Sequence, residues 1–150
     1  MVCTDIPHLA YDDGLTERII GLAIKVHRHF GPGLMESVYE ACLCLELKRG
    51  GLAVARQVSL PIFYDGIKLD NGYRADVIVE KSVILEIKSV ERLAPLHESQ
   101  LLTYLRVSGC RVGLLMNFNC VRLKNGLRHW SCDRWADAES GRLDIGPSIT

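Results

Sequence analysis

The chain has 150 residues, 48% of them hydrophobic, which is enough for a single domain with a proper core. Its 18 basic and 18 acidic residues cancel, and a formal net charge of zero excludes a strongly cationic sheath for nonspecific nucleic-acid binding. No run approaches the roughly 18 apolar residues of a membrane span, and the N-terminus has no signal-peptide pattern. We therefore expect a cytoplasmic protein with no membrane partner, in which a site for a polyanion would be local.

The first part of the chain predicts an arm and two helices. Residues 1–14 are polar and irregular, and apolar residues then recur at helical spacing over 16–30, where a Gly-Pro pair ends the helix. A second helix is predicted over 34–49, closed by two glycines. Its buried stripe is expected to consist of Val38, Cys42 and Leu45.

Polar residues gather near the start of this second helix. Tyr39 lies three residues after Glu36 and Glu40 lies four after it, so the three side chains share a side of the helix. The helix dipole alone favours a carboxylate in a first turn, which is a sufficient structural explanation for Glu36. Two acids on one face, beside a glycine that admits another backbone or a ligand, also suit a helix docked onto a metal site.

The middle of the chain predicts strands. Residues 52–64 alternate between apolar and polar, with Pro61 marking an edge or a bulge, and a short segment 67–72 follows an Asp-Gly turn. Two β-branched runs, 75–79 and 83–87, then flank a polar Glu-Lys-Ser sequence and predict an antiparallel hairpin.

This hairpin carries charges that a buried strand would normally lack: Asp76, Glu86 and Lys88. Glu86 and Lys88 are two residues apart, so they point to the same face. A three-residue loop sets Asp76 opposite Glu86, whereas a two-residue loop sets it opposite Ile87. Carboxylates that face each other repel, and a cation between them reverses the sign of that interaction.

A metal ion would explain these charges. Asp76, Glu86 and the main-chain carbonyl of Ile87 form an all-oxygen set, which suits Mg²⁺ or Mn²⁺ rather than zinc. Lys88 would then lie beside the metal, where an ammonium could position a water or balance the charge of a phosphate oxygen. The simpler alternative is that the three side chains line a solvated face of a half-exposed hairpin.

A helix predicted over 95–108 follows the hairpin, with Pro95 in a position to start it. Gln100 and Tyr104 are four residues apart and share one of its faces. A polar helix face is usually just solvated. Both side chains can, however, hydrogen-bond a substrate backbone or a metal-bound water.

The C-terminal part predicts a strand at 111–117 and a second hairpin made of 120–123 and 127–130. The Asn-Gly pair between these two runs favours a type I′ turn. From 131–150 the apolar period fades, so we expect a poorly ordered tail.

The six cysteines are expected to be mostly reduced, buried small hydrophobes, because the sequence has no C-x-x-C pair. A nucleophilic Cys42 or Cys110 with His97 as its base is a weaker alternative, since nothing in the sequence ties these residues together.

With its elements in this order, the chain resembles the PD-(D/E)XK nuclease superfamily, and more specifically the GxxExxY protein family. The resemblance covers about 15–130. It is carried, in chain order, by Gly33-Leu34-Met35-Glu36-Ser37-Val38-Tyr39, Arg74-Ala75-Asp76, Glu86-Ile87-Lys88, His97-Glu98-x-Gln100-Leu101-Leu102-x-Tyr104 and Gly113-Leu114-Leu115-Met116-Asn117-Phe118. Ala75 stands where the superfamily name has proline, a substitution that leaves the chemistry untouched.

The resemblance implies an α/β (α+β) fold with a restriction-endonuclease-like core, in which a mixed β-sheet is flanked by helices. It also implies hydrolysis of DNA or RNA by a water activated by Mg²⁺ or Mn²⁺. Asp76 and Glu86 would be metal ligands, and Lys88 would orient the attacking water. Glu36 would complete the acidic set directly or through water.

The remaining site residues implied by the resemblance are Gln100 and Tyr104, which match a Q-x-x-x-Y element that contacts substrate or stabilises the site. Tyr39 and Glu40 are candidate supporting residues. Two functions stay open: a metal-dependent nuclease, and a non-catalytic nucleic-acid-binding or protein-interaction module that retains the fold. A homodimer is expected only by analogy with small nucleases.

Overall fold

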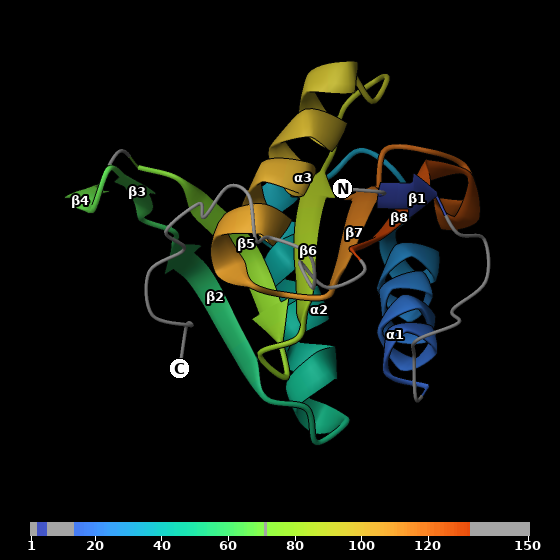
Figure 1. Cartoon of the computed structure of the whole chain (residues 1–150). Helices are drawn as coiled ribbons and strands as arrows, with labels where there is room; N and C mark the ends of the chain where they lie inside the picture. The colour runs from blue at the N-terminus through green and yellow to red at the C-terminus, as the bar shows by residue number, and fades with distance from the viewer. Residues whose placement is uncertain (1–2, 6–13, 71, 133–150) are drawn as a thin grey trace.

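The computed structural model describes residues 3–5, 14–70 and 72–132, and shows a mixed sheet with helices on both faces (Figure 1). The helices are α1 (Leu15–Phe30), α2 (Glu36–Arg49), α3 (Pro95–Ser108) and the short 3₁₀ helix η1 (Leu123–Gly126). The strands are β1 (Cys3–Asp5), β2 (Val54–Ser59), β3 (Ile62–Tyr64), β4 (Ile67–Leu69), β5 (Arg74–Val79), β6 (Val83–Lys88), β7 (Val112–Asn117) and β8 (Leu127–Cys132). No helix in these ranges is long and apolar enough to cross a membrane.

Six of the described strands form one sheet in the order β1-β8-β7-β6-β5-β2. Strands β6 and β7 are parallel, because α3 connects them, and the other neighbours are antiparallel. Strands β3 and β4 pair only with each other and project as a hairpin beyond one end of β2 and β5 (Figure 1). The predicted mixed sheet flanked by helices is therefore confirmed.

Each face of the sheet has its own core. Helices α1 and α2 cover one face, where Ile19 and Leu43 pack with Leu85 of β6. Helix α3 covers the other face, where Leu101 and Leu105 pack with residues of β5, β6 and β7. Because both faces are covered, β6 and β7 are buried along almost their whole length, which explains their continuous apolar runs.

The buried stripe predicted for α2 is wrong. Val38 and Leu45 are exposed and Cys42 is half-buried. The buried face is instead formed by Tyr39, Glu40, Leu43, Cys44 and Leu47. The helix carries apolar residues on more than one side, and packing against α1 and the sheet decides which side is buried.

The central hairpin has the register that a three-residue loop predicts. Val79 pairs with Val83 and Val77 pairs with Leu85. Glu80 and Lys81 have φ values of 52° and 53°, in the left-handed region that residues other than glycine rarely adopt. The Glu80 N–H donates to the Ala53 carbonyl and the Glu80 carboxylate accepts the Ala53 N–H, both at 2.9 Å, which holds the turn in place.

The second hairpin is wrong in its first half. Residues 120–123 form no strand, and 123–126 form η1, which leads directly into β8. Gly126 has no positive φ, so no type I′ turn forms. The glycine is needed for space: a Cβ there would collide with the Asn117 carbonyl oxygen and lie 2.9 Å from the Cys120 sulfur.

Three smaller differences concern strand limits. The predicted strand 52–64 divides into β2 and β3 at Leu60-Pro61, where proline interrupts the pairing. The predicted arm includes β1, which pairs with β8. Strand β8 itself extends to Cys132, past the predicted domain end at 130, and the rest of the predicted tail, 133–150, lies outside the described residues.

Candidate active site

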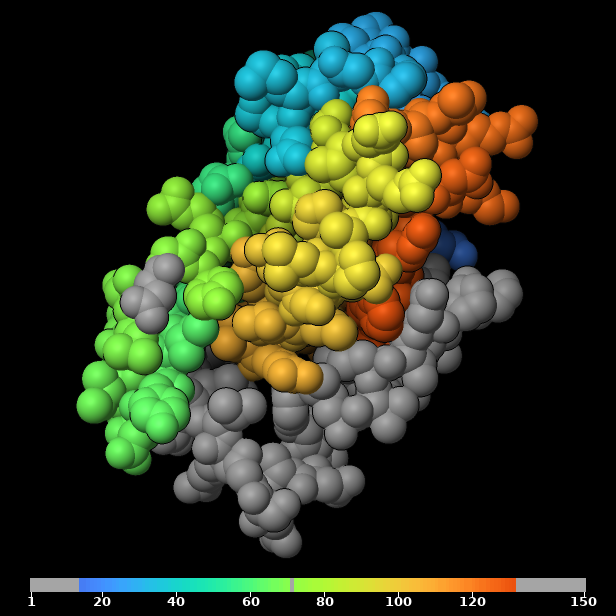
Figure 2. All heavy atoms as spheres, turned by 90° about the horizontal axis from the view of Figure 1, so that it is seen from above, coloured from blue at the N-terminus to red at the C-terminus, as the bar shows by residue number. Residues whose placement is uncertain are grey.

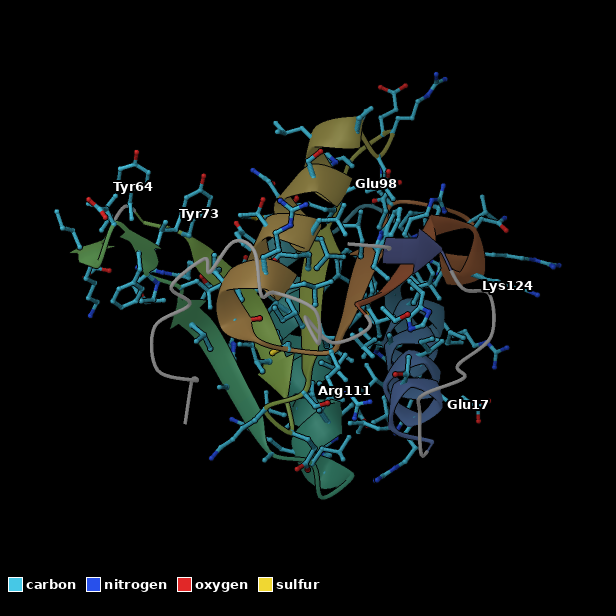
Figure 3. The ribbon with its side chains drawn as sticks, in the orientation of Figure 1. Glu17, Tyr64, Tyr73, Glu98, Arg111 and Lys124 are labelled. Carbon is cyan, nitrogen blue, oxygen red and sulfur yellow. The ribbon has the colours of Figure 1, made fainter. Side chains whose placement is uncertain are left out.

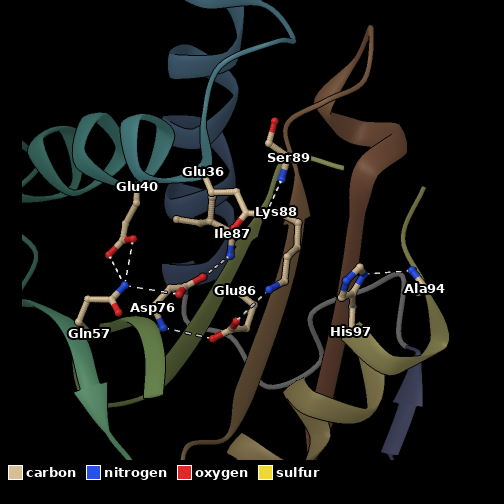
Figure 4. Close-up of polar contacts among 10 residues, drawn as sticks. All are labelled: Glu36, Glu40, Gln57, Asp76, Glu86, Ile87, Lys88, Ser89, Ala94 and His97. Atoms are coloured by element: carbon tan, nitrogen blue, oxygen red, sulfur yellow. Dashed lines mark hydrogen bonds and ion pairs between the residues drawn. The ribbon is translucent and has the colours of Figure 1, made fainter. Parts of the chain in front are cut away.

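The acidic site lies where the β5–β6 ladder opens. Main-chain pairing runs from the turn as far as Val77 and Leu85, and the next positions along the two strands are Asp76 and Glu86. There each carboxylate takes a backbone donor of the opposite strand: Asp76 Oδ2 accepts the Ile87 N–H at 2.9 Å. Glu86 Oε1 accepts the Asp76 N–H at 3.1 Å (Figure 4). The two strands thus hold both carboxylates at fixed positions beside each other.

Burial makes this pair electrostatically costly. Desolvation, followed by the charge of Asp76, raises the pKa of Glu86 from 4.5 to about 8. The pKa of Asp76 is also raised, first by desolvation and then by the charge of Glu40. Two carboxylates with raised pKa values gain stability from any cation that can approach them.

Lys88 is the nearest cation of the hairpin. Its Nζ lies 4.0 Å from Glu86 Oε2, on the side that their spacing of two residues predicts. The ammonium lowers the pKa of both Glu86 and Asp76, although less than burial raises them. It lies at the exposed end of the site, since Lys88 is half-buried whereas Glu86 is buried.

Gln57 is a site residue that sequence reasoning missed. Its Nε2 donates to both carboxylate oxygens of Glu40, at 3.0 and 3.1 Å, and lies 3.5 Å from Asp76 Oδ1 (Figure 4). In the β2–β5 register it lies opposite Asp76, between the pairs formed by its two neighbours. Its φ of 50° places a non-glycine residue in the left-handed region within a strand, and such strain is concentrated at functional sites.

The structure brings Glu40 to Asp76 through this glutamine. Glu40 is buried, and the Arg56 Nε at 3.4 Å is a second donor to its Oε1. The sequence offered one weak signal, a second polar residue directly after Arg56 within a strand. Nothing in it linked Gln57 to Glu40, which lies 17 positions earlier on α2.

Glu36 lies close to the hairpin but does not join the acidic pair. Its Oε1 accepts the Ser89 N–H at 3.2 Å, directly after β6, and the Ser89 hydroxyl donates to the Leu34 carbonyl at 2.7 Å. Tyr39 fixes the turn that precedes Glu36, since its hydroxyl donates to the Gly31 carbonyl and accepts the Leu34 N–H. An open pocket of about 600 Å³ lies here, lined by Gly33, Leu34, Met35, Glu36, Ser37, Ser89 and Asn119.

Helix α3 contributes Tyr104. Its pKa is raised by burial and then by the charges of Glu86 and Asp76, which places the phenol within the electrostatic range of the site. Gln100 is half-buried one turn earlier on the same helix. His97 lies apart from the acids: its Nδ1 accepts the Ala94 N–H at 3.0 Å and so caps the helix (Figure 4).

The four cysteines whose side chains the structure describes are free thiols, namely Cys42, Cys44, Cys110 and Cys120. Burial raises the pKa of Cys44 to about 11 and also raises the pKa of Cys110. A raised pKa lowers the thiolate fraction, and His97 is engaged with the helix end. The geometry therefore offers no support for the thiol-dependent alternative.

The donor set at the ladder opening fits a hard divalent cation in part. In the described ranges, no three His, Cys, Asp or Glu side chains are close enough together to hold a metal ion, because Glu36 and Glu40 bond elsewhere. Asp76 and Glu86, however, each use one oxygen for the backbone and keep the other outside those bonds. Two such oxygens and a main-chain carbonyl are the chemistry that Mg²⁺ or Mn²⁺ accepts, with water completing the shell.

Comparison with known families gives one match. The model of the PD-(D/E)XK nuclease superfamily matches residues 13–130, which includes every element from α1 to η1 and the start of β8. Members of this superfamily share the restriction-endonuclease-like arrangement of a mixed sheet between helices that the chain adopts. No curated protein and no solved structure matches the chain.

Proposed function

The chain belongs to the PD-(D/E)XK nuclease superfamily, and we propose that it is a nuclease that hydrolyses phosphodiester bonds of DNA or RNA with the help of Mg²⁺ or Mn²⁺. The observation that carries this proposal is the pair of carboxylate–backbone hydrogen bonds at the β5–β6 opening, with Lys88 Nζ 4.0 Å from Glu86. Glu86 accepts the Asp76 N–H and Asp76 accepts the Ile87 N–H. A sheet that served only as a scaffold would gain nothing from setting a buried Glu86 beside a half-buried Asp76, both with raised pKa values.

Each residue has a role that its position supports. Asp76 and Glu86, with the Ile87 carbonyl, would hold the ion, which polarises the phosphate and lowers the pKa of a bound water. The Lys88 ammonium would hydrogen-bond the attacking water and stabilise negative charge that develops on the phosphate. Glu36 would act through an intervening water from the adjacent turn.

The outer residues support this set. Glu40 and Gln57 hold Asp76 from the α2 side, and Tyr39 fixes the turn that carries Glu36. Tyr104 and Gln100 would contact the substrate from α3. A homodimer stays a prediction, which sedimentation would test.

The test is cleavage of single- and double-stranded DNA and RNA in Mn²⁺. We expect Lys88→Met to lower the rate by about 100-fold or more while Mn²⁺ affinity, measured by calorimetry, is nearly unchanged. Asp76→Asn is expected to lose both. Lys124→Met, far from the site at an exposed position, is the matched control (Figure 3). Cleavage that survives in Lys88→Met would contradict the proposal.

One observation favours the alternative of a binding module without catalysis: the described side chains include no group of three metal ligands. Such a module has no need for an ion. Calorimetry decides between the two functions. A nuclease should bind Mn²⁺ and lose that binding in Asp76→Asn, whereas a binding module should show no such Mn²⁺ binding.

A further inference from the structure

Three tyrosines lead outward from the acidic site, and we call them the tyrosine strip: Tyr104, Tyr73 and Tyr64. Tyr104 is the inner member: it belongs to the same packed cluster as Ala75 and Ile84, which lie on the strands of Asp76 and Glu86. The charges of these two acids contribute to its raised pKa, after burial. The Tyr73 ring stands edge-on to it, with ring centroids 6.0 Å apart and an interplanar angle of 79°. Tyr73 is 37% exposed, so part of its ring is open to solvent.

The outer member lies on the β3–β4 hairpin. Tyr64 is 74% exposed near the tip, and its cross-strand partner Ile67 is 61% exposed. The hairpin begins beside Tyr73, whose carbonyl accepts the Leu60 N–H at 2.8 Å. Tyr64 and Tyr73 project to the same side of the molecule (Figure 3), and the view from above shows the hairpin beside α3 (Figure 2). The strip therefore continues the acidic site along one side of the protein.

Folding does not explain these exposed rings. A two-stranded hairpin is marginally stable on its own, and Tyr64 and Ile67, which are mostly exposed, add little buried area to it. Large apolar side chains gathered on a projecting element beside a site usually mark a surface that binds another molecule.

The charges around the tyrosine strip limit which kind of molecule can bind there. The described residues from 62 to 74 carry Lys68 and Arg74 but also Asp65 and Asp70, and the whole chain has no net charge. A duplex is held mainly through its phosphates, which requires a basic surface. A single strand instead offers open base faces, which stack on aromatic rings with little dependence on sequence.

We propose that the tyrosine strip binds the unpaired bases of a single-stranded nucleic acid and leads the strand to Asp76 and Glu86. This inference rests on the proposed nuclease function and names its substrate class. The bases stack on Tyr64 and Tyr73, and Tyr104 supports the ring of Tyr73 from behind.

The test is equilibrium binding of a labelled oligothymidine in EDTA, where no cleavage occurs. Tyr64→Leu and Tyr73→Leu are each expected to weaken binding by about tenfold, since each removes one stacking face. Tyr64→Phe and Tyr73→Phe should bind as the wild type does. Phe30→Leu, an exposed aromatic at the end of α1, is the control and should have no effect. The logarithm of affinity should fall with that of salt by a slope of only about 1 to 2.

Several outcomes would overturn the inference. Tyr64 is too exposed for its replacement to unfold the protein, so unchanged binding by Tyr64→Leu counts directly against a stacking role. Duplex bound as tightly as the single strand contradicts the substrate class. If the leucine variants change only the self-association of the protein, the surface binds a second copy of the chain and not a nucleic acid. If the wild type cleaves nucleic acid and the leucine variants bind the oligonucleotide normally, the nuclease function holds and the strip inference fails. If the leucine variants weaken binding but the wild type cleaves nothing, the strip inference holds and the nuclease function fails.

Discussion

Asp76 and Glu86 lie at the point where the main chains of β5 and β6 stop pairing with each other. Their carboxylates accept the N–H groups that the ladder would otherwise use, so the backbone donors stay satisfied while the strands separate. The same arrangement buries Glu86, partly buries Asp76 and raises the pKa of both. The cost of that burial makes the site responsive to protons and to cations.

The first prediction concerns this proton. Because the folded protein holds the Glu86 proton more tightly than the unfolded chain, its contribution to stability is complete below about pH 4.5 and is lost as pH rises through about 8. We expect the free energy of unfolding of the metal-free protein to fall across this range, and Glu86→Gln to flatten the fall. Urea denaturation at a series of pH values measures it. Glu98→Gln is the control, because Glu98 is only half-buried. If the unfolding free energy falls with pH equally in Glu98→Gln and Glu86→Gln, the fall does not come from the Glu86 proton.

The second prediction concerns Gln57. Gln57→Leu leaves the buried Glu40 without its closest donor, so we expect a loss of about 1–3 kcal/mol in the free energy of unfolding. The double variant with Glu40→Leu should recover part of that loss, because neither partner is then left unsatisfied. Urea denaturation of the full double-mutant cycle gives the coupling. The control cycle pairs Gln57→Leu with Glu46→Gln, whose partner is Lys25, and should be additive.

At the scale of elements, the two hairpins show how turn sequences and tertiary contacts compete. Glu-Lys-Ser is a poor turn sequence, yet it closes the central hairpin in one of the two registers that the sequence left open. Two hydrogen bonds between Glu80 and Ala53 of the neighbouring segment hold that turn. Asn-Gly is a strong turn sequence, yet no hairpin forms around it. Leu123 is instead buried in the core, and the helix η1 that contains it packs against β7.

A third prediction follows from Gly126. Its replacement by alanine would push a methyl group into the Asn117 carbonyl and the Cys120 sulfur, so we expect a loss of about 1–3 kcal/mol in unfolding free energy. Gly21→Ala is the control, because a Cβ at that helical glycine would meet nothing within 4 Å outside the helix's own backbone, and its φ is ordinary. It should instead gain about 0.5–1 kcal/mol. Thermal unfolding of both variants measures the difference, and equal shifts would show that the close approach at Gly126 relaxes freely.

At the scale of the whole molecule, the acidic site lies between layers that the chain builds far apart in sequence. Helix α2 brings Glu36 and Glu40 to one side of the β5–β6 opening, and α3 brings Tyr104 to the other. Stability of this assembly should therefore depend on the ion that the site is proposed to bind.

The fourth prediction is a metal-linked gain in stability. Mn²⁺ at about 100 times its dissociation constant should add about 2.7 kcal/mol to the free energy of unfolding. For a chain of this size, that corresponds to a rise of about 5–10 °C in Tm. At one fixed Mn²⁺ concentration, the rise should be larger at pH 9 than at pH 6, because Glu86 must lose its proton to bind the ion. Asp76→Asn should abolish the rise in thermal scans and Asp65→Asn, at an exposed turn, should keep it; equal rises in both would place the ion elsewhere.

The sequence by itself determined the three long helices and the central hairpin, because helical spacing and short apolar strand runs are local properties. The sequence left two hairpin registers open, and of these the structure has the one that sets Asp76 opposite Glu86. It could not determine which face of α2 is buried, that 120–126 coils against β7, or that Gln57 joins Glu40 to Asp76. Those features depend on contacts between segments that no local pattern links, and only the packed sheet and its helices bring them together.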